Sequence, residues 1–212
     1  MTEERDFVLK LLQLNLIVCL IPTYIGTISF GDIYQWYDGD GDNSLWLCDN
    51  DAVPNAELNS MYLGYADLLG LNLQNASFYG SILSHANFTD CHLQNSILQY
   101  TVSESSIFTN VNLSGSNLSY SNFTAANFQN ASLYGSDVSY SNFSGADFQG
   151  ARLIGILDWT ATTWAGATYN DDTIFSQGMN PDEMGMLYVP VPTVATLALF
   201  SIAGCTIRRR RS

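Results

Sequence analysis

Basic residues are nearly absent from this chain. Its 212 residues hold seven Lys and Arg against twenty Asp and Glu, for a formal net charge of -13. Four of the basic residues stand at 208–211, and Arg152 is the single base between residues 32 and 189. Because binding to a phosphate backbone needs cationic side chains, this composition excludes a nucleic-acid-binding protein.

Charged residues of either sign are few, at 13% of the chain, whereas hydrophobic residues make up 47%. Intrinsically disordered proteins combine low hydrophobicity with a high density of charge, so a charge-driven disordered chain is also excluded. The length fits one folded domain together with processing segments at its ends.

The N-terminal 31 residues have the pattern of a signal peptide. Residues 7–30 are mostly apolar, but their uninterrupted core at 16–21 is short. A membrane-spanning helix needs about 20 apolar residues, whereas the apolar region of a signal peptide needs only about 7–15. Ser29 and Gly31 then supply the small residues of a cleavage site. We expect a signal helix over residues 1–31, with an uncleaved N-terminal anchor as the alternative.

The C-terminal end predicts a second apolar helix. Residues 194–207 carry no charge and are followed directly by four arginines. Terminal arginines favour the cytoplasmic side of a membrane, which places the body of the protein outside it. With Pro190 and Pro192 before the helix, residues 189–212 resemble the PEP-CTERM sorting signal of bacteria. That resemblance implies processing by an exosortase-type enzyme, membrane contact through this helix, and an anchored or cell-surface protein.

Between these ends the chain repeats every five residues without interruption from 56 to 155. A large residue marks the centre of each unit, and the residue two positions earlier is usually small. Ser103 is the single polar centre. A period of five fits neither a strand nor a helix, so we expect a chain that turns a corner once per unit and stacks its coils as a β-solenoid. The centres are Leu58, Leu63, Leu68, Leu73, Phe78, Leu83, Phe88, Leu93, Leu98, Ser103, Phe108, Leu113, Leu118, Phe123, Phe128, Leu133, Val138, Phe143, Phe148 and Leu153.

A longer period of twenty residues sets the number of sides. Every fourth centre from Leu68 reads Leu, Phe, Phe, Phe, Phe, and every fourth centre from Leu73 is Leu. This segregation predicts a four-sided coil in which Phe88, Phe108, Phe128 and Phe148 lie one over another. At about 4.8 Å per layer, about five coils make a rod roughly 24 Å tall.

The repeat resembles the pentapeptide-repeat family, whose unit is A-(D/N)-L-x-x. Close copies of that unit begin at Ala66, Ala86, Ala126 and Ala146. The resemblance implies an all-β fold, a right-handed quadrilateral β-helix. We therefore divide the chain into a signal peptide (1–31), an acidic N-terminal cap (32–55), the solenoid (56–155), a C-terminal cap (156–188) and the sorting tail (189–212).

Solenoid ends expose core residues and need caps. Trp36 and Trp46 are expected over the first coil, and Trp159, Trp164 and Phe175 over the last. Cys91 is expected as a small buried residue, the alternative being a disulfide with Cys48.

An acidic run in the N-terminal cap is a candidate calcium site. Asp38, Asp40 and Asp42 alternate along the chain, and Asp49 stands at the twelfth position of the run. Carboxylates at this spacing resemble a calcium loop and could supply several oxygen ligands. A solvated acidic turn is the alternative, and no other cofactor is expected.

Three tyrosines form the candidate binding surface. Tyr100, Tyr120 and Tyr140 each stand two positions after a centre in the same column, so they should form an outward aromatic ladder. Stacked tyrosines could hold a sugar or a partner protein, or could simply stabilise neighbouring coils.

The sequence contains no catalytic cluster, and we expect a protein without enzymatic activity. The leading hypothesis is an exported structural or adhesive solenoid that binds a protein or an extracellular polymer at the cell surface. One alternative is an acidic DNA mimic acting on gyrase, like the gyrase-protecting pentapeptide proteins. Another is a polysaccharide-acting enzyme.

Overall fold

The computed structural model describes the backbone of residues 32–36, 45–51 and 53–191, and the side chains of residues 53–191. The predicted signal helix (1–31), the predicted apolar helix (194–207) and the acidic run at 38–42 lie outside these residues. Within the part of the chain described, no helix reaches the length and apolarity that a membrane crossing requires.

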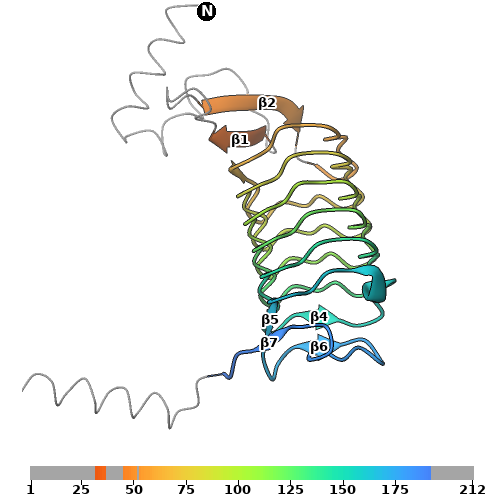
Figure 1. Cartoon of the computed structure of the whole chain (residues 1–212). Coiled ribbons are helices and arrows are strands. Elements are labelled where there is room, and N and C mark those ends of the chain that lie inside the picture. Colours follow the sequence, from red (N-terminus) through yellow and green to blue (C-terminus); the bar gives the residue numbers. More distant parts are fainter. Residues whose placement is uncertain (1–31, 37–44, 52, 192–212) are drawn as a thin grey trace, which may run out of the picture.

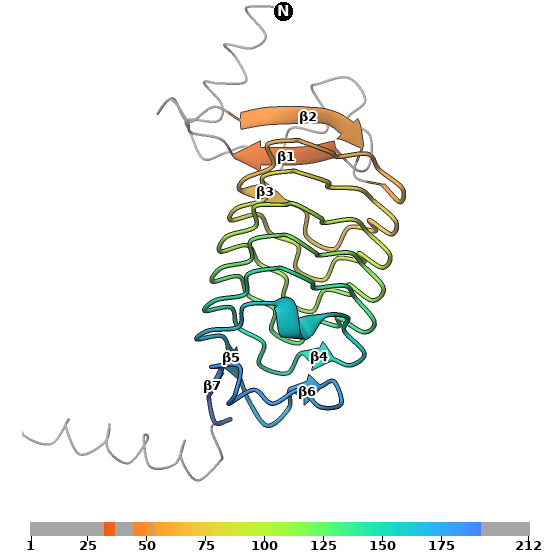
Figure 2. The same ribbon diagram turned by 45° about the vertical axis from the view of Figure 1, so that its right-hand side comes forward.

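The chain winds as a four-sided solenoid, seen from the side in Figures 1 and 2. Single parallel β-bridges join each layer to the next, between residues twenty apart as far as the bridge of Asp137 with Leu157, as in Glu57 with Ser77 and Ile107 with Asn127. The series runs unbroken from Glu57 to Leu157. The predicted period of twenty residues, and with it the four-sided coil, is confirmed.

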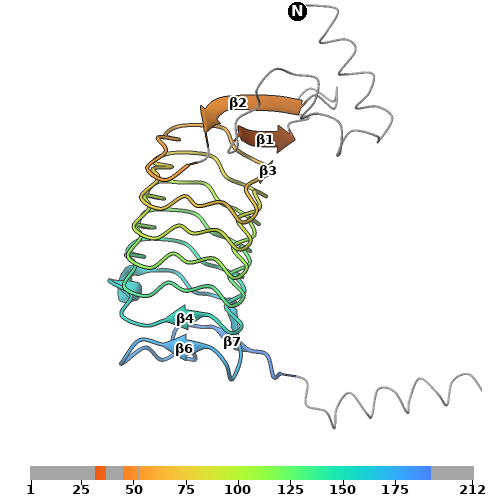
Figure 3. The same ribbon diagram turned by 180° about the vertical axis from the view of Figure 1, so that it is seen from behind.

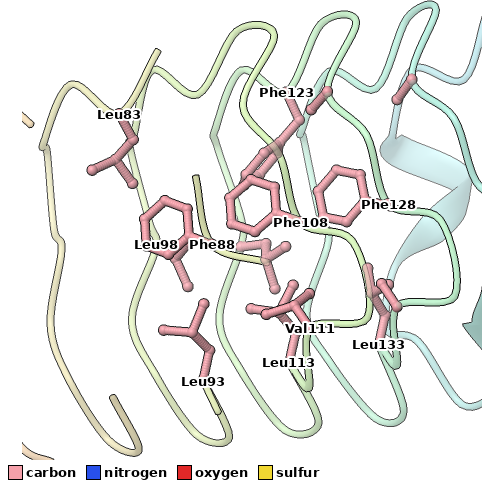
Figure 4. Packing of buried hydrophobic residues seen from close by; sticks show 14 of the residues in the cluster. Leu83, Phe88, Leu93, Leu98, Phe108, Val111, Leu113, Phe123, Phe128 and Leu133 are labelled. Atoms are coloured by element: carbon pink, nitrogen blue, oxygen red, sulfur yellow. The ribbon is translucent and has the colours of Figure 1, made fainter. Parts of the chain in front are cut away.

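The interior is filled by the predicted centres. All twenty, from Leu58 to Leu153, are fully buried. The phenylalanine column is confirmed, with ring centroids 4.9 Å apart for Phe88 and Phe108 and 4.8 Å apart for Phe108 and Phe128 (Figure 4). Phe148 continues the stack at 5.1 Å from Phe128. The column is therefore a continuous wall of stacked rings along the rod.

The polar centre, Ser103, is accommodated by a small network of hydroxyl groups. Its Oγ donates to Thr101 Oγ1 at 3.1 Å, and Thr101 Oγ1 donates to the Leu98 carbonyl at 2.9 Å. A buried hydroxyl costs little when it is paired in this way.

The corners explain why Asn, Gly and Ser are abundant. The residue two positions after each centre has a positive φ, for example 58° at Asn95 and 71° at Gly115. Asn and Gly adopt this left-handed conformation at the lowest cost. Just before ten of the twenty centres, an Asn or Asp side chain closes a local turn. Asn87 Oδ1, for instance, accepts from the backbone N–H and the hydroxyl of Thr89 at 3.1 and 2.7 Å.

A hairpin covers one edge of the first coil. Strand β1 (Asp32–Trp36) pairs antiparallel with β2 (Leu45–Asp51) and, on its other side, with β3 (Ala66–Asp67). The view in Figure 3 shows the hairpin at the N-terminal end of the rod. An open strand edge invites pairing with other chains, and this hairpin occupies the edge at β3. The backbone of the predicted cap therefore lies where a cap is needed, whereas the side chains of Trp36 and Trp46 lie outside those described.

Residues 156–188 continue the winding with local irregularities. The short 3-10 helix η2 (Trp159–Ala161) adds one residue to its coil, so that Asn142 bridges Thr163. Strand β4 (Arg152–Leu153) then pairs in parallel with β6 (Ile174–Phe175), and β5 (Thr168–Tyr169) with β7 (Leu187–Tyr188). Trp164 is buried at a centre position and stacks on Phe143 with 5.0 Å between ring centroids.

Candidate interaction surface

Tyr100, Tyr120 and Tyr140 form a stacked column on the outside of one corner, which we call the Tyr ladder. Ring centroids are 5.1 Å apart for Tyr100 and Tyr120 and 4.9 Å apart for Tyr120 and Tyr140, with interplanar angles of 17° and 15°. The exposed fractions of the three side chains are 47%, 47% and 62%. The structure thus brings together the three residues that the sequence selected, pointing to solvent.

The backbone of the ladder is strained for this residue type. The φ angles of Tyr100, Tyr120 and Tyr140 are 61°, 58° and 56°. A left-handed conformation costs an L-residue other than glycine roughly 1–2 kcal/mol. Stacking of aromatic rings returns roughly 0.5–1.5 kcal/mol per pair. The ladder therefore adds little net stability to the solenoid relative to the Asn or Gly found at other corners.

A fourth ring extends the ladder toward the N-terminal end. Tyr79 meets Tyr100 edge to face, with centroids 5.4 Å apart and an interplanar angle of 70°. Tyr79 could not be recognised from the periodicity as part of the ladder. In its layer the ladder position is Gly80, and Tyr79 stands one residue before it. Tyr79 directly follows the centre Phe78, at a position whose side chain points outward, and this was the one sequence feature that could have indicated it.

Uncharged amides and hydroxyls flank the ladder. On the face before it, which we call the leading face (57–59, 77–79, 97–99, 117–119 and 137–139), Gln99 Nε2 donates to Ser119 Oγ at 3.1 Å. On the face after it, which we call the trailing face (62–64, 82–84, 102–104, 122–124 and 142–144), Asn142 Nδ2 donates to Thr124 Oγ1 at 3.0 Å. Three carboxylates also lie on these faces, Glu57 and Asp137 on the leading face and Glu104 on the trailing face.

Exposed hydrophobic side chains concentrate around the same corner. Between residues 56 and 155, twelve large hydrophobic side chains are exposed, and eight of them lie on the leading face, the trailing face or the corner between them. Three of these follow one another in successive layers of the trailing face, and we call them the outer stripe: Tyr62, Ile82 and Val102. The other five are Tyr79, Ile97, Tyr100, Tyr120 and Tyr140. Contiguous exposed apolar surface of this kind is typical of interaction sites.

The calcium prediction falls largely outside the described residues. Asp38, Asp40 and Asp42 are not described, and only the backbone of Asp49 is, in β2. Within the described residues, no group of three or more His, Cys, Asp and Glu side chains could hold a metal ion. Calcium binding therefore stays a prediction.

The remaining reactive side chains are separated from one another. Cys91 is free and buried, and its Sγ donates to the Leu68 carbonyl at 2.7 Å. Burial raises the pKa of the Cys91 thiol from 9.0 to about 12, which keeps it protonated at neutral pH. His92 is exposed, whereas Cys91 points inward, so the two are not a catalytic pair. His85 stacks on Tyr65 at a different corner, with ring centroids 4.7 Å apart.

Comparison with known proteins identifies the repeat. The family model for pentapeptide repeats matches in eight copies over residues 56–95, 86–124, 106–144 and 126–156. No curated protein matches the chain.

Solved structures of similar proteins include two from cyanobacteria. The pentapeptide repeat protein Rfr23 from Cyanothece 51142 is 22% identical, with 56% of this chain and 84% of that chain covered and a TM-score of 0.25. The pentapeptide repeat protein alr5209 from Nostoc Pcc 7120 is 22% identical, with coverages of 60% and 84% and a TM-score of 0.28. QnrB1, a plasmid-mediated fluoroquinolone resistance protein, is 13% identical, with coverages of 72% and 96% and a TM-score of 0.27.

The repeat register, the four-sided winding and the family match agree residue by residue over the same segment. Pentapeptide repeats form right-handed quadrilateral β-helices, as the resemblance of the sequence implied. Residues 56–156 of this chain are a segment of pentapeptide repeats.

Proposed function

We propose that this chain is an exported, non-enzymatic interaction protein, a rod that presents a fixed aromatic surface to a protein or an extracellular polymer at the cell surface. The observation that carries the proposal is the Tyr ladder. Its three rings are stacked in register, exposed to about half or more, and adopt a backbone conformation that Asn or Gly would adopt at lower cost.

The rest of the solenoid supports a binding role. Every layer is joined to the next on all four sides by backbone hydrogen bonds, which fixes the spacing of the outward side chains. A site that is held rigidly loses little conformational entropy on binding. The ladder also stands on a convex corner, whereas small-molecule and catalytic sites are usually concave. A macromolecular partner fits this shape better than a small substrate.

Export rests on the two ends of the sequence. The signal peptide expected at 1–31 and the PEP-CTERM-like tail at 189–212 place the solenoid outside the cytoplasmic membrane, with transient or lasting attachment through the apolar stretch at 194–207. The tail would be the substrate of an exosortase-type enzyme.

A DNA mimic acting on gyrase is the weaker alternative. Such a mimic needs a dense array of carboxylates along the rod. Here the solenoid carries six acids in one hundred residues, and Arg152 offsets one of them. They are spread over several sides, since Glu104 lies on the trailing face, Asp137 on the leading face and Asp90 at another corner.

The test combines cell fractionation with intact-mass analysis of the native protein. We expect the protein in the envelope or extracellular fraction, with a mass that shows removal of residues 1–31. The full chain should also bind isolated cell-surface material, and replacing Tyr100, Tyr120 and Tyr140 with Ser should abolish that binding at unchanged fold. Tyr134→Ser, at an exposed tyrosine on the side opposite the trailing face, is the control. A cytoplasmic protein that inhibits or protects gyrase in a supercoiling assay would overturn the proposal.

A further inference from the structure

We propose that the partner recognised by this surface is a second copy of the same chain, packed antiparallel with trailing face against trailing face. This inference rests on the interaction role proposed above and names the partner for it. It is carried by the way in which the large and small side chains of the surface are distributed along the rod.

The surface has two unlike halves. Toward the N-terminal end, the trailing face carries Tyr62 and Ile82, while the corner beside them carries Ser60 and Gly80, with the ring of Tyr79 bordering Gly80. Toward the C-terminal end the arrangement is reversed. There Tyr120 and Tyr140 occupy the corner, and the adjacent positions of the trailing face are Asn122 and Asn142. The large side chains therefore lie on the trailing face in the N-terminal half and at the corner in the C-terminal half.

A two-fold axis across the trailing face makes these halves complementary. The axis lies between the two faces and runs perpendicular to the rods. It therefore reverses the order of the layers, while the Tyr-ladder corner of one copy still faces the Tyr-ladder corner of the other. With the axis at the level of Tyr100, Tyr120 of one copy lies over Gly80 of the other and beside its Ile82. Tyr140 then lies over Ser60 and beside Tyr62. Because the same twenty-residue layer repeats in both copies, all of these contacts form in one register.

Gly80 has no side chain of its own, and the ring of Tyr79 borders its corner, where it meets Tyr100 edge to face. Apart from the chain neighbours of Gly80, only Ser60 Oγ lies within 4 Å of a Cβ atom built on it, at 3.6 Å. Tyrosine is among the residues enriched at protein interfaces and among those that contribute most to binding energy there.

Charge permits self-association on this face, as it does on the opposite face (72–74, 92–94, 112–114, 132–134 and 152–154), which carries no carboxylate. Two copies of a chain with a net charge of -13 repel each other, so they can approach only where carboxylates are sparse. The trailing face from 62 to 144 carries a single charged residue, Glu104. In the proposed arrangement the two Glu104 side chains lie on either side of the axis, and their repulsion opposes association. Glu104 Oε1 accepts from Asn122 Nδ2 at 2.7 Å, a bond that glutamine can also accept.

The size of the face makes the dimer weak. Five layers at about 4.8 Å and five residues at about 3.3 Å give a face of roughly 24 by 16 Å, or about 400 Å². Stable complexes bury about 800 Å² per partner. Dimers should therefore form where rods are crowded, as on a surface. Antiparallel packing suits rods that are attached by their C-terminal ends to two opposing surfaces.

A charge-swap experiment on the full-length chain tests the register. Ile82→Glu and Tyr120→Lys should each weaken self-association at least about ten-fold in sedimentation equilibrium, because each disrupts both symmetric contacts. A mixture of the two variants should associate within about three-fold of the unmodified chain, since the carboxylate introduced in one copy then meets the ammonium group introduced in the other. Tyr134→Lys, on the opposite side of the rod, should have no effect. Circular dichroism melting of each variant separates lost association from lost folding.

Glu104→Gln gives a second measurement that does not disturb packing, and it should strengthen association by removing the repulsion across the axis. A chain that stays monomeric at all concentrations, or variants whose association mixing does not restore, would overturn the inference. If self-association fails in this way but the variant with Ser at positions 100, 120 and 140 still loses binding to cell-surface material, the proposed function stands and only the dimer is ruled out. Antiparallel dimers of a cytoplasmic protein would instead support the inference and overturn the proposed function.

Discussion

The ring of Phe128 lies on the ring of Phe108, with 4.8 Å between centroids and 7° between planes, although twenty residues of chain separate them. The distance equals the spacing of hydrogen-bonded β-layers. Side-chain stacking inside the rod and backbone pairing in its walls therefore have the same period, and each stabilises the other. Rod geometry is fixed by this agreement rather than by long strands, since β3, β4, β5, β6 and β7 have only two residues each.

Removing one ring from this column should destabilise the whole rod. Phe108 stacks on both Phe88 and Phe128 and meets Phe123 edge to face. Phe108→Ala should cost about 3–5 kcal/mol of unfolding free energy, because it leaves a cavity that rigid neighbouring layers cannot close. Urea unfolding followed by both circular dichroism and tryptophan fluorescence measures the loss.

The neighbouring residue provides the matched control. Ile107 belongs to the same layer, but its side chain points outward and is partly exposed. Ile107→Ala should change the free energy of unfolding by no more than about 0.5 kcal/mol. Equal losses for the two variants would contradict the role of the phenylalanine column.

The five-residue register and the column of rings could be predicted from the sequence because each layer repeats the same local problem. A large inward side chain, a small one at the corner, and a polar turn residue recur in most units, so one exception cannot shift the pattern. The repeat also often places Asn directly before a centre and Ser or Thr directly after it, which creates several Asn-x-Ser/Thr sequences. In the segment from Asn122 to Thr124, the Asn122 Oδ1 atom accepts from the backbone N–H and Oγ1 of Thr124 at 3.1 and 2.6 Å, which is a structural role.

The C-terminal coils and the extent of the surface could not be predicted in this way. The extra residue at η2 breaks the spacing that the register relied on, so that Trp164 reaches a centre position 21 residues after Phe143. Tyr79 joins the ladder only because Gly80 leaves its corner empty, a relation between neighbouring layers rather than within one unit. Sequence periodicity shows which side chains point outward, but not how outward side chains from different columns meet.

Buried serine hydroxyls are predicted to stabilise particular corners. Ser121 Oγ accepts from the Thr101 backbone N–H at 3.0 Å and donates to the Leu98 carbonyl at 2.6 Å. Ser121→Ala should cost about 1–2 kcal/mol, because both buried groups lose this partner. Ser121→Thr should retain stability, since Thr101 occupies the equivalent position one layer earlier. Thermal unfolding of the two variants decides the point, and a Thr variant as unstable as the Ala variant would argue for packing instead.

Two glycine corners should respond differently to the same substitution. Gly150 and Gly135 both have positive φ angles, 71° and 65°, so alanine carries a backbone cost at each. A Cβ at Gly150 would clash with Asn130 Oδ1, whereas a Cβ at Gly135 would meet nothing within 4 Å. Gly135→Ala should cost about 1 kcal/mol and Gly150→Ala about 1 kcal/mol more, measured by urea unfolding. Gly150→Ala combined with Asn130→Gly, which keeps a residue suited to the left-handed corner at position 130, should recover the difference, and failure to do so would show that Asn130 is not the obstacle.

Cys91 should make the stability of the rod depend on pH in the alkaline range. Burial raises its pKa from 9.0 to about 12, so the folded protein holds the thiol proton that the unfolded chain releases above pH 9. This contribution is complete below pH 9 and is lost as the pH rises toward 12. Unmodified protein should therefore lose more stability between pH 8 and 11 than Cys91→Ala, a substitution that fits because Ala131 and Ala151 are buried at the same position in later layers. Thiol labelling at neutral pH should find the same number of reactive cysteines in the folded unmodified chain and in the folded variant. After unfolding, the unmodified chain should show one more. Labelling of Cys91 in the folded rod would contradict its burial.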